Sequence, residues 1–389
     1  MISRSPRSIS TLGRVFDDFS TSYKLFWFRA LLEVLKVNWQ TEPPATVRRP
    51  GRSLAARDLL QEMVLAAWVP VCVFRLSLGA TDRLQLGCRK LATLAGLNEH
   101  SSLREVRTAF CSASNHAAGL TDILTYVPAL FLAPWFTAEM RGIAGGSARV
   151  RKARQLARAK ADSPDRPPYW VDGVGGSQKI ILDPVWEVFF FENLAVLEAF
   201  VDHRLAVYLQ NQNPNSPGIV RKLRLPVRRQ LAGPRAFWLA LRDRLQEANQ
   251  AEVFADIYTR QVLSDRFSLD HFLPWSFVAH DQLWNLAPVS AVTNSRKGDA
   301  LPVASYITAL ATLHWTALTR MTDHRKAMEE YELCFQQTIA DLQQQGLAAF
   351  VRRYFAMLTP QLQIASNQGF PIGWEPRSPA FSPKAAPAS

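Results

Sequence analysis

Apolar residues recur at helical spacing over much of this chain, and this periodicity limits the fold more than any other feature. In residues 15–37 the apolar side chains fall every three to four positions, and Ser20 or Thr21 is the predicted cap. Asp183 and Pro184 mark another helix start, with the acid at the cap and the proline in the first turn. The predicted helices cover residues 15–37, 54–79, 102–111, 184–210, 234–248, 303–321 and 323–345, with a shorter one ending near 358. The chain is therefore predicted to be mainly α.

The composition predicts a folded protein whose charge suits phosphate-bearing partners. The 389 residues are 48% hydrophobic and 20% charged, which is too apolar for a largely disordered chain. The formal net charge is +12 and comes from arginine-rich clusters, a pattern typical of nucleic-acid-binding proteins. Such a charge can equally serve solubility alone, so composition leaves both interpretations open.

The cysteines and the apolar runs favour a reducing compartment and no membrane segment. The cysteines lack both the C-x-x-C spacing of a zinc ribbon and a dense disulfide pattern, so we expect free thiols and no structural zinc; they are Cys72, Cys88, Cys111 and Cys334. The most apolar runs, residues 63–74 and 123–136, contain prolines and are shorter than the ~20 residues that span a bilayer. The first residues also lack the apolar core of a signal peptide. We therefore expect a cytoplasmic protein.

Shifts in composition divide the chain into four predicted regions. Residues 1–140 form a helical N-terminal region, and residues 141–249 form a basic middle region with a hairpin and a long helix. Residues 250–358 form a core region with C-terminal helices. Residues 371–389 are rich in proline and serine and are predicted to be a disordered tail.

Two basic segments lie in the middle region. The first spans residues 142–168 and is either a solvated helix or an arm that follows phosphates. Its cations are Arg149, Arg151, Lys152, Arg154, Arg158 and Lys160. The second is a predicted nucleic-acid patch that consists of Arg221, Lys222, Arg224, Arg228 and Arg229.

Residues 268–302, SLDHFLPWSFVAHDQLWNLAPVSAVTNSRKGDALP, place polar groups at offsets that suit phosphodiester hydrolysis. The β-prone runs 254–258 and 267–269 predict a hairpin whose second strand ends at Asp270 and His271. Neighbouring side chains on a strand diverge. The imidazole can therefore take a proton from water on one side of a phosphate, while the carboxylate holds a cation on the other.

A short helix is predicted to follow, from the cap Ser290 to Lys297, with Gly298 as its stop. Asn294 and Lys297 are three positions apart and share one face of this helix. The asparagine oxygen is a hard ligand that suits Mg²⁺ or Mn²⁺, and the lysine can reach a phosphate oxygen.

With this order of residues the segment resembles the HNH endonucleases, whose core carries an acid and a histidine, then an asparagine, then a histidine or asparagine. Here Asp270 with His271, then Asn285, then Asn294 stand at those positions. The offsets from His271 are also similar to those in the HNH domain of RNA-guided CRISPR effector nucleases. Bacterial proteins that carry the version DHFLPWSFVAHDQLWNLAP resemble the segment more closely.

The resemblance implies a small α+β catalytic core, the ββα-metal motif, embedded in helices. It implies that His271 is the general base, that Asp270 and Asn294 bind one divalent cation, and that Asn285 braces the loop and orients His271. Asparagine at the third position favours Mg²⁺ or Mn²⁺. The implied reaction is hydrolysis of DNA to 5′-phosphate and 3′-hydroxyl ends, with RNA left open as a substrate.

The basic residues beside the site and the biological role are further expectations. Arg266 and Arg296 flank the site and either hold backbone phosphates or are solvated surface arginines. We expect a role in bacterial defence or restriction, with a surface for a sensor or partner in the residues before 250. The alternative is a protein that grips nucleic acid, or serves as a subunit of a larger complex, without cutting.

Overall fold

The computed structural model describes residues 6, 8–17, 21–44, 51–112, 118–225 and 229–376, which form two compact units. The N-terminal unit comprises Met1–Pro214 with Ile219–Leu225, and the C-terminal unit comprises Asn215–Gly218 with Pro226–Ser389. The predicted boundary between residues 249 and 250 lies inside the C-terminal unit. The reason is that helix α11 (Ala232–Glu247) buries Phe237, Trp238 and Leu241 in the core of that unit.

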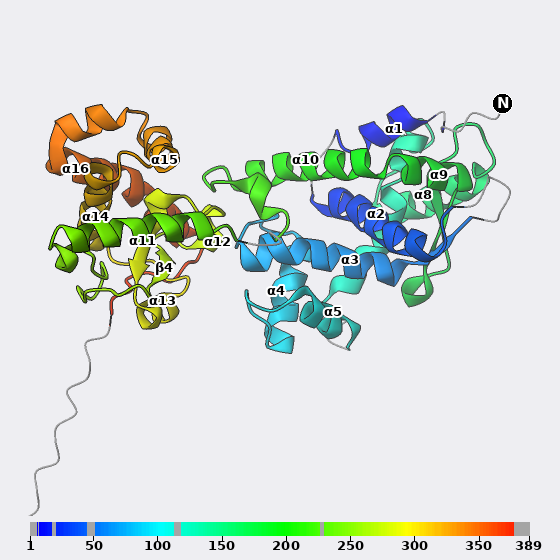
Figure 1. The fold of residues 1–389 in the computed structure, drawn as a ribbon. Coiled ribbons are helices and arrows are strands. Elements are labelled where there is room, and N and C mark those ends of the chain that lie inside the picture. The colour runs from blue at the N-terminus through cyan, green and yellow to red at the C-terminus, as the bar shows by residue number, and fades with distance from the viewer. Residues whose placement is uncertain are drawn as a thin grey trace, which may run out of the picture. The chain divides into compact units, whose positions relative to one another are not determined.

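The chain is mainly α, as predicted, with two small antiparallel sheets among the described residues (Figure 1). The α-helices in the described part of the N-terminal unit are α1 (Ile9–Arg14), α2 (Tyr23–Thr41), α3 (Ala56–Trp68), α4 (Arg83–Ala95), α5 (Leu103–Cys111), α7 (Ile123–Leu130), α8 (Gly146–Ala159), α9 (Pro184–Glu192) and α10 (Leu194–Gln212). Besides α11, those of the C-terminal unit are α12 (Trp275–Val278), α13 (Ala291–Lys297), α14 (Tyr306–Arg320), α15 (Arg325–Phe335) and α16 (Ile339–Asn367). No helix in the described part of the chain is long and apolar enough to cross a membrane.

In the N-terminal unit the central helix is α2, which lies between α3 and α10 (Figure 1). It begins at Tyr23 after Ser22, close to the predicted cap at Ser20 or Thr21, and residues 9–14 before it form the separate helix α1. Strands β1 (Ser53–Ala55), β2 (Tyr169–Asp172) and β3 (Lys179–Leu182) pair in the order β1-β3-β2, so the predicted hairpin forms. Asp183 caps α9 through the N–H groups of Val185 and Trp186, as predicted.

In the C-terminal unit one apolar core joins α11, α14, α15 and α16 to a second sheet. This sheet consists of β4 (Ser268–His271) and β5 (Leu286–Val289), which pair in antiparallel register. The helix predicted over 323–345 is broken at Gln336, whose φ of 53° is left-handed and ends α15. Gly346, predicted as a helix end, is instead a kink within α16, with φ at 79°.

The segment 371–376, predicted as the start of a disordered tail, is packed against the C-terminal unit. Leu301 donates its N–H to the carbonyl of Pro371 at 2.7 Å, and Trp374 donates its own to the carbonyl of Leu301 at 2.9 Å. The indole of Trp374 meets the ring of Tyr258 edge to face, with centroids 5.0 Å apart. This aromatic contact explains the order that composition failed to predict; the rest of the predicted tail, residues 377–389, lies outside the described residues.

Candidate active site

Asp270 and His271 are the last two residues of β4, as the sequence predicted, but the strand has a different partner. It pairs with β5, and His271 stands opposite Leu286. The predicted partner, residues 254–258, contributes only an isolated bridge between Ala255 and Val262. The predicted hairpin was therefore wrong, although it placed the end of β4 correctly.

A buried aspartate inside the run 254–258 explains why this run turns instead of extending. Asp256 is completely buried, and its Oδ1 accepts the N–H groups of Tyr258 and Thr259. Its other oxygen accepts the N–H of Ser290 at 3.0 Å. Asp256 thus closes a turn and ties it to the residue that caps α13.

The Asp270 carboxylate is buried, with 2% of the residue exposed, and both of its oxygens accept a hydrogen bond. Oδ1 accepts from the ammonium of Lys297 at 3.1 Å, and Oδ2 accepts from the hydroxyl of Tyr258 at 2.8 Å. Burial raises the pKa of Asp270 above its ordinary value, while Lys297 and Tyr258 oppose this rise. Burial also raises the pKa of Tyr258 well above its usual range, so its hydroxyl stays protonated and donates.

Lys297 is turned inward rather than toward solvent. Its side chain is buried, and besides Asp270 it donates to the backbone carbonyl of His271 at 2.7 Å. The prediction that this ammonium reaches a phosphate oxygen does not match that position. Lys297 instead joins the acid and the backbone of the histidine through one buried cation.

His271 is 7% exposed, and its Nε2 lies 3.0 Å from Oδ1 of Asp281. The second oxygen of Asp281 accepts the N–H of Gln230 at 2.9 Å. Partial burial alone would raise the pKa of Asp281, but the hydrogen bonds from His271 and Gln230 outweigh it and hold this pKa below the ordinary value. An ionised Asp281 favours the hydrogen on Nε2, which leaves the Nδ1 lone pair of His271 to accept a proton.

Asn285 is completely buried and bonds to both backbone groups of one residue in the loop after β4. Its Oδ1 accepts the N–H of Leu273 and its Nδ2 donates to the carbonyl of Leu273, each at 2.8 Å. Its own carbonyl accepts the N–H of Phe272 at 2.8 Å. These three bonds fix the two residues that directly follow His271.

Asn294 lies on α13, whose bounds agree with the prediction: Ser290 caps it and Gly298 ends it. The Ser290 hydroxyl accepts the N–H of Thr293 at 3.0 Å. Asn294 is half-buried, and its side-chain amide makes no hydrogen bond within the described ranges. It stands one turn before Lys297 on the same face of α13, and α13 packs against β4.

The chemical type of these donor atoms suits a magnesium ion. Asp270 and Asn294 offer hard oxygen atoms, and Mg²⁺ in proteins is commonly held by one or two carboxylates while it keeps several waters. No group of three or more His, Cys, Asp and Glu residues that could hold a metal occurs within the described ranges. The cysteines are all free, with Cys88 buried and Cys111 exposed.

The basic residues predicted to contact nucleic acid lie in different surroundings. Arg266, Arg296 and Arg221 are exposed. Arg224 is exposed but paired with Asp202 at 2.8 Å, and the guanidinium of Arg229 lies 4.4 Å from the ring centroid of Trp275. Arg228 lies outside the described residues.

Lys222 departs most from its predicted role as a surface cation. It is completely buried, and burial lowers its pKa from the usual value to about 7. A buried ammonium is not placed to meet a phosphate at the surface. The predicted patch over residues 221–229 is therefore not one continuous basic surface.

Three residues of the site were not identified from the sequence: Tyr258, Asp256 and Asp281. Tyr258 and Asp256 fall within a run that composition favours as a strand, and nothing in its pattern shows the turn. Asp281 contacts His271 because the chain reverses after α12, where Ala279 adopts a left-handed φ of 57°. No spacing signal in the sequence predicts this contact.

A comparison with families of known proteins matches residues 255–303 to the family described as HNH endonuclease. The matched segment contains the turn closed by Asp256, both strands of the second sheet and α13. No curated protein and no solved structure matches the chain.

Proposed function

The chain contains an HNH endonuclease domain at residues 255–303, and on this premise we propose that it is a metal-dependent endonuclease that hydrolyses phosphodiester bonds of DNA. The observation that carries the proposal is the arrangement around the end of β4. There a histidine paired with an aspartate, His271 and Asp281, stands next to a second carboxylate, Asp270, that is held by a separate cation.

His271 acts as the general base in this proposal. Asp281 holds the hydrogen on Nε2, so Nδ1 takes a proton from the water that attacks phosphorus. The attack breaks the bond to the 3′-oxygen and leaves 5′-phosphate and 3′-hydroxyl ends. Asn285 keeps the loop after His271 in place and acts as a positioning residue.

Asp270 and Asn294 are the residues that would hold a divalent cation, Mg²⁺ or Mn²⁺. When bound, such a cation supplies positive charge to the phosphate and to the departing 3′-oxygen. Lys297 limits the negative charge that Asp270 offers, because the same carboxylate accepts from its ammonium. The residues expected to hold flanking phosphates are Arg266 and Arg296, which are both exposed.

A plasmid-nicking assay with Mg²⁺ or Mn²⁺ tests the proposal. We expect the wild type to nick, EDTA to stop it, and His271→Ala to lose activity by a factor of roughly a hundred or more, as expected for removal of a general base. Arg325→Ala, an exposed residue on α15, serves as the matched surface control. Equal nicking by the wild type and His271→Ala would contradict the assignment of the base.

One observation favours a second candidate, a non-cleaving nucleic-acid-binding subunit. The ammonium of Lys297 already lies against Asp270, so the carboxylate is paired without any metal. In that case the wild type and His271→Ala would bind DNA equally, and neither would cut it with any divalent metal.

The biological role that we propose is bacterial defence or restriction in the cytoplasm, where incoming DNA is met. Expression of the wild type should protect host cells from phage or plasmid entry, and expression of His271→Ala should not. Equal protection by both proteins would favour the binding subunit instead.

A further inference from the structure

Helix α8 carries arginines on one side, next to its packed face. Ala153 and Ala157 are completely buried and mark the face that packs on the N-terminal unit. Arg151, Arg154 and Arg158 stand at i, i+3 and i+7, so at about 3.6 residues per turn they share one side of the helix, on which Arg151 and Arg158 are exposed and Arg154 is half-buried. We name these three residues the arginine stripe.

The positive charges of this segment are not neutralised by acidic residues within it. Residues 146–160 contain no acid, and their cations are Arg149, Arg151, Lys152, Arg154, Arg158 and Lys160. Lys160 pairs with Glu139 at 2.5 Å, but the side chain of Arg151 makes no ion pair or hydrogen bond among the described residues. Like charges at i, i+3 and i, i+4 destabilise a helix, so the stripe costs stability that an anionic partner would restore.

Two members of the stripe are held in place by the neighbouring hairpin. The guanidinium of Arg158 lies over the ring of Trp170, 5.4 Å from its centroid. Arg154 donates to the carbonyl of Gly173 in the turn after β2. Side chains fixed in this way lose less conformational entropy when they bind a ligand.

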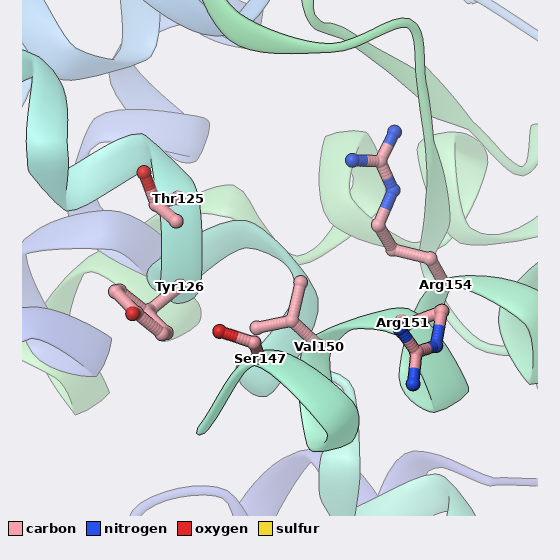
Figure 2. A pocket seen from close by; sticks show the side chains of 6 residues that line it. All are labelled: Thr125, Tyr126, Ser147, Val150, Arg151 and Arg154. Carbon is pink, nitrogen blue, oxygen red and sulfur yellow. The ribbon is translucent and has the colours of Figure 1, made fainter. Parts of the chain in front are cut away.

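A pocket of about 300 Å³ opens beside the stripe. Thr125 and Tyr126 line it from α7, and residues of α8 line the other side, namely Ser147, Val150, Arg151 and Arg154 (Figure 2). It thus combines an aromatic ring, hydroxyl groups and two guanidinium groups. These are the groups that contact the bases, sugars and phosphates of nucleic acids.

The length of the stripe matches a nucleic-acid backbone. Arg151 to Arg158 spans about 10 Å of helix axis at ~1.5 Å per residue. One strand of a duplex advances ~3.4 Å per phosphate, so the three arginines cover about three phosphates.

We propose that the arginine stripe and the adjoining pocket form a nucleic-acid-binding surface of the N-terminal unit, with the phosphate backbone on the arginines. As a surface that holds the substrate, it rests on the proposed nuclease function. As a binding surface, it is tested separately from cleavage.

The test measures binding of a fluorescein-labelled DNA duplex, and of its single strand, by anisotropy over a range of salt concentrations. All variants carry His271→Ala, so the probe stays intact if the enzyme proposal holds. The stripe variant is Arg151→Gln with Arg154→Gln and Arg158→Gln. The matched control removes the same charge from exposed residues of α4 and α5 in the same unit, through Arg89→Gln, Lys90→Gln and Arg104→Gln.

We expect the stripe variant to bind DNA about tenfold more weakly at about 0.1 M salt. The salt slope, which is the slope of log K against log salt concentration, should become shallower by about two to three, whereas the control changes little. Arg154 and Arg158 also contact the hairpin, so Arg151→Gln alone is a second variant that does not touch it. This single change should lower the slope by about one. Circular dichroism and thermal melting check that each variant is folded.

Equal affinity and equal salt slope in the stripe variant and the control would overturn the proposal. So would binding of inorganic phosphate or a mononucleotide at the pocket with no change in DNA binding. Stripe-dependent binding by a wild type that fails to nick would uphold this surface and reject the nuclease function.

Discussion

The ammonium of Lys297 lies 3.1 Å from the Asp270 carboxylate, and both side chains are buried. The same ammonium donates to the backbone carbonyl of His271 at 2.7 Å. One cation thus compensates a buried charge and fixes the strand end that carries the proposed base. Loss of Lys297 would leave a carboxylate buried without its countercharge.

Lys297→Met should lower the free energy of unfolding of the C-terminal unit by about 3–5 kcal/mol, the usual cost of breaking a buried ion pair on one side. The double variant Asp270→Asn with Lys297→Met should recover part of this loss, because it also removes the unpaired charge. Chemical denaturation measures both, with the exposed neighbour Arg296→Met as the control. A single variant as stable as the wild type would contradict the structural role of the pair.

Asp281→Asn should reduce the turnover number about 10- to 100-fold with little change in KM, because it removes the charge that fixes the His271 tautomer but leaves the substrate contacts. Asp281→Glu should restore part of the activity. The pH dependence of kcat should also shift in Asp281→Asn, an effect that a purely structural defect would not produce. Asp265→Asn, an exposed acid of the same unit, is the control; an unchanged kcat and pH profile in Asp281→Asn would remove Asp281 from the site.

Asn285→Ala should cost about 2 kcal/mol or more in the free energy of unfolding. The substitution leaves the buried N–H and carbonyl of Leu273 without their partners. Activity measured well below the melting temperature should fall as well, since the loop after His271 loses its brace. A variant that keeps full activity and stability would show that the loop holds its shape without this side chain.

The free energy of unfolding of the C-terminal unit should decrease as the pH is lowered, because of His314. Burial lowers its pKa to about 3, and its Nδ1 lies 2.6 Å from the Tyr331 hydroxyl. A free histidine titrates near 6.5, so the unfolded chain binds a proton between about pH 6.5 and pH 3 while the folded chain does not. The contribution is complete above about 6.5 and declines as the pH falls, by roughly 2 kcal/mol at pH 5. His314→Gln should flatten this part of the pH dependence in thermal melts; an identical slope in both proteins would exclude His314 as the source.

Local signals predicted the parts of the site that local forces determine. Helix α13 begins after Ser290, whose hydroxyl caps its first turn, and ends at Gly298. Both ends can be predicted from the residue types alone. The partner of β4 was predicted wrongly because the buried Asp256 closes a turn in a run of β-prone residues. The i, i+3 spacing placed Asn294 and Lys297 on one face, but only the tertiary structure shows that Lys297 points inward to Asp270. The contact between His271 and Asp281 depends on the path of a loop, which no local pattern specifies.

The edge-to-face contact between Trp374 and Tyr258 links the order of synthesis to the assembly of the site. Tyr258 donates the hydrogen bond that holds Oδ2 of Asp270, and Trp374 follows it by more than a hundred residues. The chain leaves the ribosome with its N-terminus first, so Tyr258, Asp270 and His271 emerge well before the indole that packs against Tyr258. The HNH segment is thus completed only after Trp374 has been synthesised, and a nascent chain that stops short of Trp374 carries Asp270 and His271 without this closing contact.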